Sequence, residues 1–145
     1  MTAEIICVGT ELLLGNIVNT NAAFLSEKLA YLGINCYFQT VVGDNRDRLL
    51  SVINTALSRA DILIFSGGLG PTEDDLTKET VAEALGKKLI RDKWAEQEIA
   101  DYFALRGRIP TDNNWKQADV IEGCEILYNK NGTAPGIFVS EGEKT

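Results

Sequence analysis

The sequence predicts an α/β fold in which helices cover both faces of a mainly parallel sheet. Two observations support this fold class: apolar runs alternate with segments of helical periodicity through the first 86 residues, and each run ends at small residues followed by a carboxylate. Strands that alternate with helices imply βαβ crossovers. A length of 145 residues fits one domain with a real core.

Three βα units are predicted in the first part of the chain. Residues 4–8 (EIICV) predict a strand buried on both faces, followed by a loop and then by a helix that starts near residue 21 and stops at Gly33. Residues 34–42 predict the second strand, and Asp44 or Asn45 can cap the helix after it. Residues 61–65 predict the third strand, and the helix after it closes at Gly86.

The pattern is looser after residue 86. Residues 94–105 predict a helix, residues 111–118 a short helix after Pro110, and residues 124–127 and 136–139 two short strands around the loop NGTAPG. The last strand runs into a polar glycine turn with no partner strand after it. We therefore expect the chain to be the N-terminal piece of a longer protein.

Composition excludes several classes of protein. With 14 basic and 21 acidic residues the net charge is −7, which argues against a nucleic-acid partner. The absence of histidine removes histidine-based triads and zinc sites, so a metal here needs oxygen ligands. Cys7, Cys36 and Cys124 fit reduced packing residues of a cytoplasmic protein. The N-terminus resembles neither a signal peptide nor a membrane span, so no membrane partner is expected.

The stretch SGGLGPTEDDLT at residues 66–77 is the strongest candidate site. In a parallel α/β sheet, ligands bind where strands end. Glycines at 67, 68 and 70 let the backbone approach a phosphate, and the start of the next helix favours an anion. The acids at 73–75 would repel a bare phosphate, so the combination favours a divalent cation between acids and phosphate. Ordinary turn formation and helix capping remain the alternative.

Other candidates are less specific. Asp44 either caps the second helix or belongs to the site. Thr10 and Glu11 follow the first strand, and the apolar trio after Glu11 either packs under the loop or lines a base pocket. The loop with Asn131, Gly132 and Thr133 is either a turn or a nucleotide-binding loop.

Four segments of the chain resemble the N-terminal domain of the CinA family, the competence- and damage-inducible proteins. They are VGTELLLGNIVNTNAAFLSEKLAYLGI from residue 8, VVGDN at 41–45, FSGGLGPTEDDLTKE at 65–79 and NGTAPG at 131–136, in the family's order. The resemblance implies the three-layer α/β/α fold of the molybdopterin-binding superfamily and a homo-oligomer, dimer or trimer. It also implies a metal-dependent ADP-ribose pyrophosphatase. Full-length members usually carry a C-terminal amidohydrolase domain, which we do not expect within these 145 residues.

The resemblance also assigns roles to residues. The superfamily's two functional aspartates fall on Asp44 and Asp75, and its phosphate loop falls on Gly67, Gly68, Gly70 and Thr72. We hypothesise that Asp75, with Asp74 or Asp44, holds Mg²⁺, Mn²⁺ or Co²⁺, and that Asp44 or Glu11 is the general base. The alternatives are a module that binds molybdopterin or a nucleotide phosphate without hydrolysis, and an oligomerisation platform.

Overall fold

The centre of the molecule is a parallel sheet of three strands, as predicted. The computed structural model describes residues 1–142, and residues 143–145 lie outside the described part. Strand β1 (Thr2–Val8) lies between β2 (Asn35–Val42) and β3 (Ile62–Ser66), and both neighbours pair with it in parallel. Ile5 and Ile6 of β1 are completely buried and point to opposite faces, which explains the continuous apolar run in the sequence.

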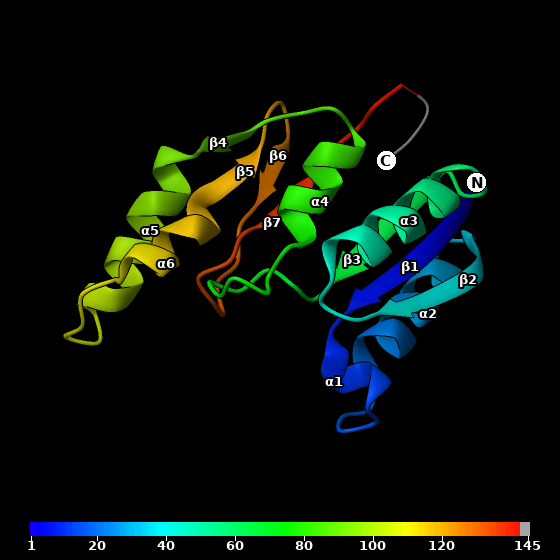
Figure 1. The fold of residues 1–145 in the computed structure, drawn as a ribbon, viewed down its shortest axis with the longest axis horizontal. Coiled ribbons are helices and arrows are strands. Elements are labelled where there is room, and N and C mark those ends of the chain that lie inside the picture. Colours follow the sequence, from blue (N-terminus) through cyan, green and yellow to red (C-terminus); the bar gives the residue numbers. More distant parts are fainter. Residues whose placement is uncertain (143–145) are drawn as a thin grey trace.

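Helices cover both faces of this sheet (Figure 1). Helix α2 (Thr20–Tyr31) packs with Ile5 on one face, and α3 (Arg46–Leu57) packs with Ile6 on the other, where α4 (Thr77–Ala84) adds Val81 and Ala84. The three-layer α/β/α prediction is confirmed in this part. A difference lies at residues 10–13, where a loop was expected and one helical turn, α1 (Thr10–Leu13), forms.

The caps of α2 and α3 settle one open alternative. The Asn19 side chain accepts a hydrogen bond from the N–H of Ala22, and the Asn45 side chain accepts one from the N–H of Arg48. Asn45 therefore caps α3, and Asp44 is free for another partner.

The second half of the described chain extends to one side of the sheet (Figure 1). Its elements are β4 (Leu89–Arg91), α5 (Lys93–Ala104), α6 (Asp112–Trp115), the 3₁₀ turn η1 (Lys116–Ala118), β5 (Asp119–Ile121), β6 (Glu125–Leu127) and β7 (Gly136–Phe138). The predicted pair β6 and β7 forms an antiparallel ladder, and so does the unpredicted pair β4 and β5. Ala95, Ile99 and Ala118 form a small separate core here.

None of the helices formed by residues 1–142 has the length and apolar character needed to cross a membrane. The three cysteines are free thiols, and Cys7 is buried in the sheet.

Candidate functional site

The three predicted sites at the carboxyl ends of the strands lie along one edge of the sheet, because all three strands are parallel. Gly67 lies directly against the end of β1. Its φ of +97° is unfavourable for other residues, and a Cβ atom would lie 2.0 Å from the carbonyl oxygen of Val8. Glycine is therefore required at position 67 by the protein's own packing, in addition to any role toward a ligand.

Asp44 binds Thr10 across the ends of β1 and β2. The Thr10 N–H donates to Asp44 Oδ2 over 2.8 Å, and the Asp44 N–H donates to Thr10 Oγ1 over 3.2 Å. Glu11 is exposed, and its carboxylate lies over Gly9. The structure thus brings Thr10, Glu11 and Asp44 together at one end of the edge.

Asp75 organises the other end of the edge, the glycine loop. Its Oδ2 accepts hydrogen bonds from the N–H of Thr72 at 2.9 Å and from Thr72 Oγ1 at 2.5 Å. A Cβ atom at Gly70 would lie 2.5 Å from the same oxygen, so the loop folds tightly around this carboxylate. Burial alone would raise the pKa of Asp75, but hydrogen bonds from Thr72 and Gly70 and the charge of Lys116 hold this pKa below its usual value. Asp75 is therefore ionised at neutral pH.

The start of α4 packs onto the same loop. Thr77 Oγ1 donates to the Gly67 carbonyl at 2.8 Å, and the Thr77 N–H donates to the Gly68 carbonyl at 3.2 Å. The predicted juxtaposition of glycine loop and helix N-terminus is present, and the loop itself uses one N–H group of the helix.

The acids of the loop do not assemble a metal centre by themselves. Glu73 and Asp74 are exposed, and within residues 1–142 there is no group of three or more acidic or cysteine side chains placed to hold a metal ion. Asp44 comes after β2 and Asp75 after β3, and these two strands are separated by β1, which places the strands about 10 Å apart at the usual spacing. Mg²⁺ usually binds through one or two carboxylates together with substrate phosphates, so this donor set fits such an ion only with a phosphate ligand present.

The third predicted loop reaches the glycine loop through Gln117. The Thr133 hydroxyl donates to Gln117 Oε1 at 2.7 Å, and Gln117 Nε2 donates to the carbonyl of Leu69 at 3.3 Å. Gly132 is partly buried and Asn131 is exposed. Thr133 thus lies beside the glycine loop. The sequence alone had not decided whether this segment is a turn or a binding loop.

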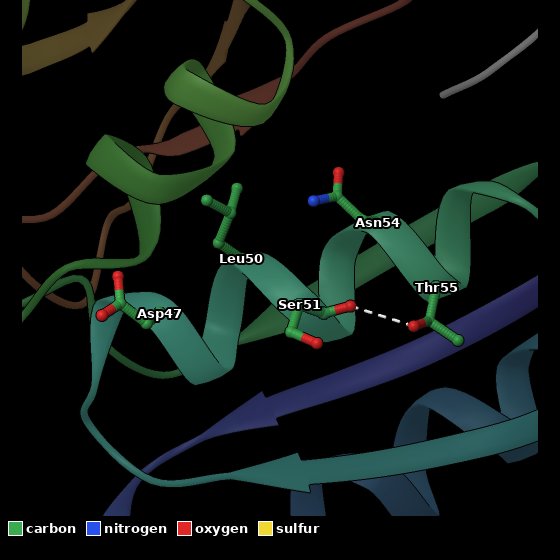
Figure 2. Close-up of a pocket in the computed structure, with 5 residues that line it drawn as sticks. All are labelled: Asp47, Leu50, Ser51, Asn54 and Thr55. Atoms are coloured by element: carbon green, nitrogen blue, oxygen red, sulfur yellow. Dashed lines mark hydrogen bonds between the residues drawn. The ribbon is translucent and has the colours of Figure 1, made fainter.

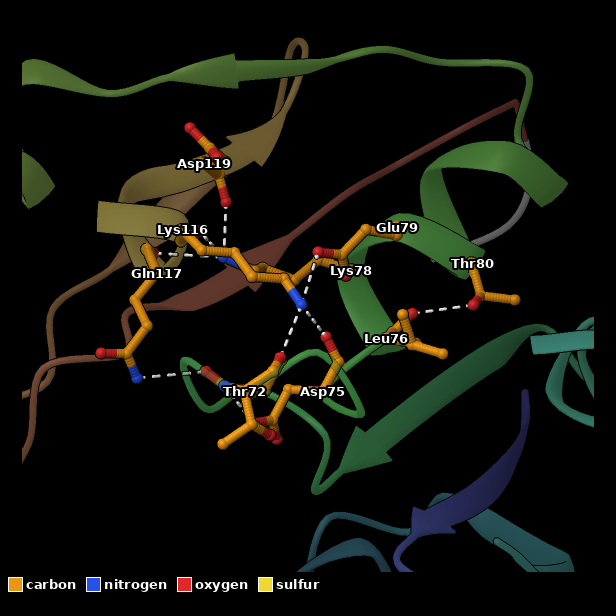
Figure 3. A network of polar contacts seen from close by, with 10 residues as sticks. Thr72, Asp75, Leu76, Lys78, Glu79, Thr80, Lys116, Gln117 and Asp119 are labelled. Carbon is orange, nitrogen blue, oxygen red and sulfur yellow. Dashed lines mark hydrogen bonds and ion pairs between the residues drawn. The ribbon is translucent and has the colours of Figure 1, made fainter. Parts of the chain in front are cut away.

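Sequence reasoning missed three residues around the loop: Lys78, Lys116 and Gln117. Lys116 donates to the carbonyls of Thr72 and Asp75, and Lys78 holds the carbonyls of residues 116, 117 and 119 (Figure 3). Lys116 and Gln117 belong to the segment TDNNWKQA, which predicted only a short helix. No local pattern indicates that a lysine will bind carbonyls more than 40 residues away.

One hollow of the described surface lies away from these loops, and another adjoins them through Leu69 and Thr77. An open depression on the outer face of α3 is lined by Asp47, Leu50, Ser51, Asn54 and Thr55, all from one helix (Figure 2). It contains no predicted site residue. A cleft of about 480 Å³ lies between the β3 and α4 side of the sheet and β7, and most of its lining is apolar, including Phe65, Val81 and Ile137.

Comparisons with known proteins agree with this geometry. The family model described as the probable molybdopterin binding domain matches residues 4–145. A competence-damage inducible protein of Bacillus cereus is 59% identical over 144 residues, which are 99% of this chain and 35% of the relative. The chain thus spans about one third of the length of this curated relative.

Solved structures give the same result. The CinA protein of Thermoplasma acidophilum superposes with a TM-score of 0.90 at 38% identity, over 99% of this chain and 83% of that one. The molybdopterin biosynthesis enzyme MoaB of Thermus thermophilus superposes with a TM-score of 0.56 at 18% identity, over 83% of this chain and 78% of that one, and supports the fold alone.

Proposed function

Because the chain belongs to the molybdopterin-binding domain family and is a homologue of CinA, we propose that it hydrolyses the diphosphate bond of a nucleoside-diphosphate sugar such as ADP-ribose. Water attacks one phosphorus atom, the bridging phosphorus–oxygen bond breaks, and AMP and ribose 5-phosphate leave. The observation that supports this proposal most is the arrangement of one edge of the sheet, which carries the glycine loop with ionised Asp75 at one end and the Thr10–Asp44 pair at the other.

The residues of the chain have separate tasks in this proposal. Backbone N–H groups of the glycine loop hold the charge that develops on the phosphate. The Thr72 hydroxyl donates to Asp75 in this structure, so it adds to this binding only when its proton turns from Asp75 to the phosphate. Asp44 or Glu11 accepts the proton of the attacking water. Asp75, with Asp74 or Asp44, would hold Mg²⁺, Mn²⁺ or Co²⁺, and a bound ion would polarise a phosphoryl oxygen and lower the pKa of the attacking water.

A second candidate function is binding without hydrolysis. In the described residues the carboxylates of Asp44 and Asp75 both already accept hydrogen bonds from the protein, and no third acid joins them in a metal-binding group. A loop ordered in this way can hold a phosphate of molybdopterin or a nucleotide with the backbone N–H groups of its glycines, without a metal ion. A homo-oligomer and a cytoplasmic location stay predictions under either function.

Release of AMP from ADP-ribose tests the proposal. The protein is incubated with ADP-ribose and each of the three metal ions, beside Asp75→Asn and the control Asp112→Asn. The side chain of Asp112 is exposed and has no hydrogen bond with the described residues. We expect metal-dependent AMP that falls by at least about a hundredfold in Asp75→Asn and stays unchanged in Asp112→Asn. Tight binding of ADP-ribose without AMP release would favour the second function, and full activity of Asp75→Asn would refute the role of Asp75.

A further inference from the structure

Lys116 binds both ends of the turn that carries Asp75. Its Nζ donates to the carbonyl of Thr72 at 2.9 Å and to the carbonyl of Asp75 (Figure 3). The Asp75 carboxylate accepts hydrogen bonds from the N–H and the hydroxyl of Thr72. The turn is therefore stabilised both by its own Asp75 side chain and by the bonds from Lys116 to its carbonyl groups. A lysine of the second half of the chain thereby holds the backbone at both ends of the turn from which the Asp75 carboxylate extends.

Gln117 connects this loop with the loop at residues 131–136. Gln117 is only 4% exposed. Its amide N–H donates to the Leu69 carbonyl, and its amide oxygen accepts a hydrogen bond from the Thr133 hydroxyl. A buried amide whose donor and acceptor are both used has one favoured orientation. Gln117 therefore holds the two loops at a fixed separation.

Lys78 holds in place the backbone segment that carries Lys116 and Gln117. This lysine of α4 is 5% exposed, and its Nζ donates to the carbonyls of Lys116 at 3.0 Å, Gln117 at 3.2 Å and Asp119 at 2.6 Å. The short 3₁₀ turn that presents Lys116 and Gln117 is thus fastened to the helix that begins at the glycine loop. Two segments about 40 residues apart in sequence form one closed unit.

We propose that Lys116 and Gln117 are positioning residues that lock the acid-bearing part of the glycine loop against the 131–136 loop, so that both loops serve one phosphate-containing ligand. The proposal rests on the proposed function, since it takes the glycine loop to be the phosphate site. It adds that the 131–136 loop belongs to the same site and that its distance from Asp75 is set by residues that do not touch the substrate.

Glu79 has to be separated from this role. Lys116 Nζ lies 3.3 Å from Glu79 Oε1, and Glu79 Oε2 is buried with no hydrogen-bond partner in the described residues. Lys116→Met alone would leave this carboxylate without its cation and would weaken the protein for that reason. The double variant Glu79→Gln/Lys116→Met removes the unpaired charge, so its effect on the loop does not include the cost of a buried carboxylate without its ion-pair partner.

The experiment measures loop order and turnover in parallel. Hydrogen exchange is followed in peptides covering residues 66–77 and 131–136, with α3 as the internal reference, in the wild type, Lys116→Met, Lys116→Arg, the double variant and Thr133→Val. Lys93→Met is the matched control, because Lys93 is exposed and its side chain has no hydrogen bond or ion pair with the described residues. The kcat and KM for ADP-ribose with Mg²⁺ are measured on the same samples.

We expect exchange at 66–77 to rise about tenfold in Lys116→Met and in the double variant, with α3 unchanged and partial recovery in Lys116→Arg. Thr133→Val should raise exchange at 131–136, and kcat should fall in all variants that loosen the loops. The proposal would be overturned if exchange at 66–77 were unchanged in the double variant. It would also be overturned if exchange there rose as much in Lys93→Met as in Lys116→Met. If the wild type releases no AMP, the hydrolytic function fails, and the exchange data still decide whether Lys116 and the Gln117–Thr133 bond order the loops.

Discussion

Glu4 is a carboxylate buried completely in the central strand. Arg59 donates to it through Nε at 2.8 Å and Nη2 at 2.7 Å, and Thr40 Oγ1 donates at 2.7 Å. The guanidinium group also lies 3.7 Å from the centre of the Phe38 ring. Burial would raise the pKa of Glu4, but the hydrogen bonds from Arg59 and Thr40 and the charge of Arg59 outweigh it and lower the pKa from its usual value of 4.5.

The two partners are not equivalent, so their replacements should differ. Arg59→Met leaves a fully buried carboxylate without its cation, whereas Glu4→Gln leaves a guanidinium group that is one third exposed and can be hydrated. We expect Arg59→Met to be the more destabilising change in urea denaturation at pH 7. Equal loss in the two variants would contradict this order.

The lowered pKa of Glu4 also fixes a direction with pH. A carboxyl group whose folded pKa lies below its unfolded pKa contributes stability above about pH 4.5, and this contribution is lost as the pH falls through the folded pKa. The stability difference between the wild type and Glu4→Gln should therefore shrink below pH 4.5. Urea titrations at several pH values measure it, and a difference that grows in acid would show that the pKa is raised.

At the scale of elements, prediction from sequence worked where the pattern was long. Strand β1 is recognisable in the sequence because residues 3–8 are all buried and its apolar run is therefore continuous. Helix α3 is recognisable because Leu49, Ile53 and Ala56 face the core and therefore recur at helical spacing. Strands β4 and β5 have three residues each and carry Arg91 and Asp119 at their ends, so neither shows alternation. Their pairing depends on partners about 30 residues apart, which a single-sequence pattern does not contain.

The same reason explains which site residues were found. Asp44, Thr72 and Asp75 follow strand ends and lie in recognisable loops. Lys116 and Gln117 lie in a plain helical segment and reach the loop only through the tertiary fold. Whether the predicted metal ligands act as such stays a prediction.

Lys78 joins two elements, α4 and the segment with η1 and β5. Burial lowers its pKa, and the three carbonyl bonds keep its ammonium group in place. Lys78→Met leaves these carbonyls without a donor in a poorly hydrated place, which should cost about 2 kcal/mol in free energy of unfolding. Lys88→Met is the matched control, because Lys88 is exposed and its side chain has no hydrogen bond or ion pair with the described residues.

Urea denaturation of both variants measures this cost, with hydrogen exchange at residues 116–121 as the local readout. Exchange there should rise in Lys78→Met while the β1–β2–β3 sheet stays protected. If Lys78→Met unfolds at the same urea concentration as Lys88→Met, the cost of burying the charge balances the three bonds and Lys78 does not fasten the two elements.

At the scale of the whole molecule, the described chain leaves apolar surface in the cleft beside β3. All five residues of β3 are only partly buried, unlike those of β1, because β3 forms one edge of the sheet. The cleft of about 480 Å³ is bounded on its far side by Leu127 and Phe138 of the β6–β7 hairpin, and both are substantially exposed. A cavity of this size with apolar walls suits a small apolar molecule.

The uncharged dye Nile red tests the accessibility of this cleft, since a protein of net charge −7 would repel an anionic dye. We expect the fluorescence of the dye to rise and shift to the blue with native protein, and to fall severalfold in Leu127→Glu, which places a charge at the wall of the cleft. Leu105→Glu makes the same chemical change at a leucine that is 86% exposed and does not line the cleft, so it should leave the signal unchanged. Equal loss in the two variants would place the dye elsewhere on the surface, and the cleft would then be closed to solvent in solution.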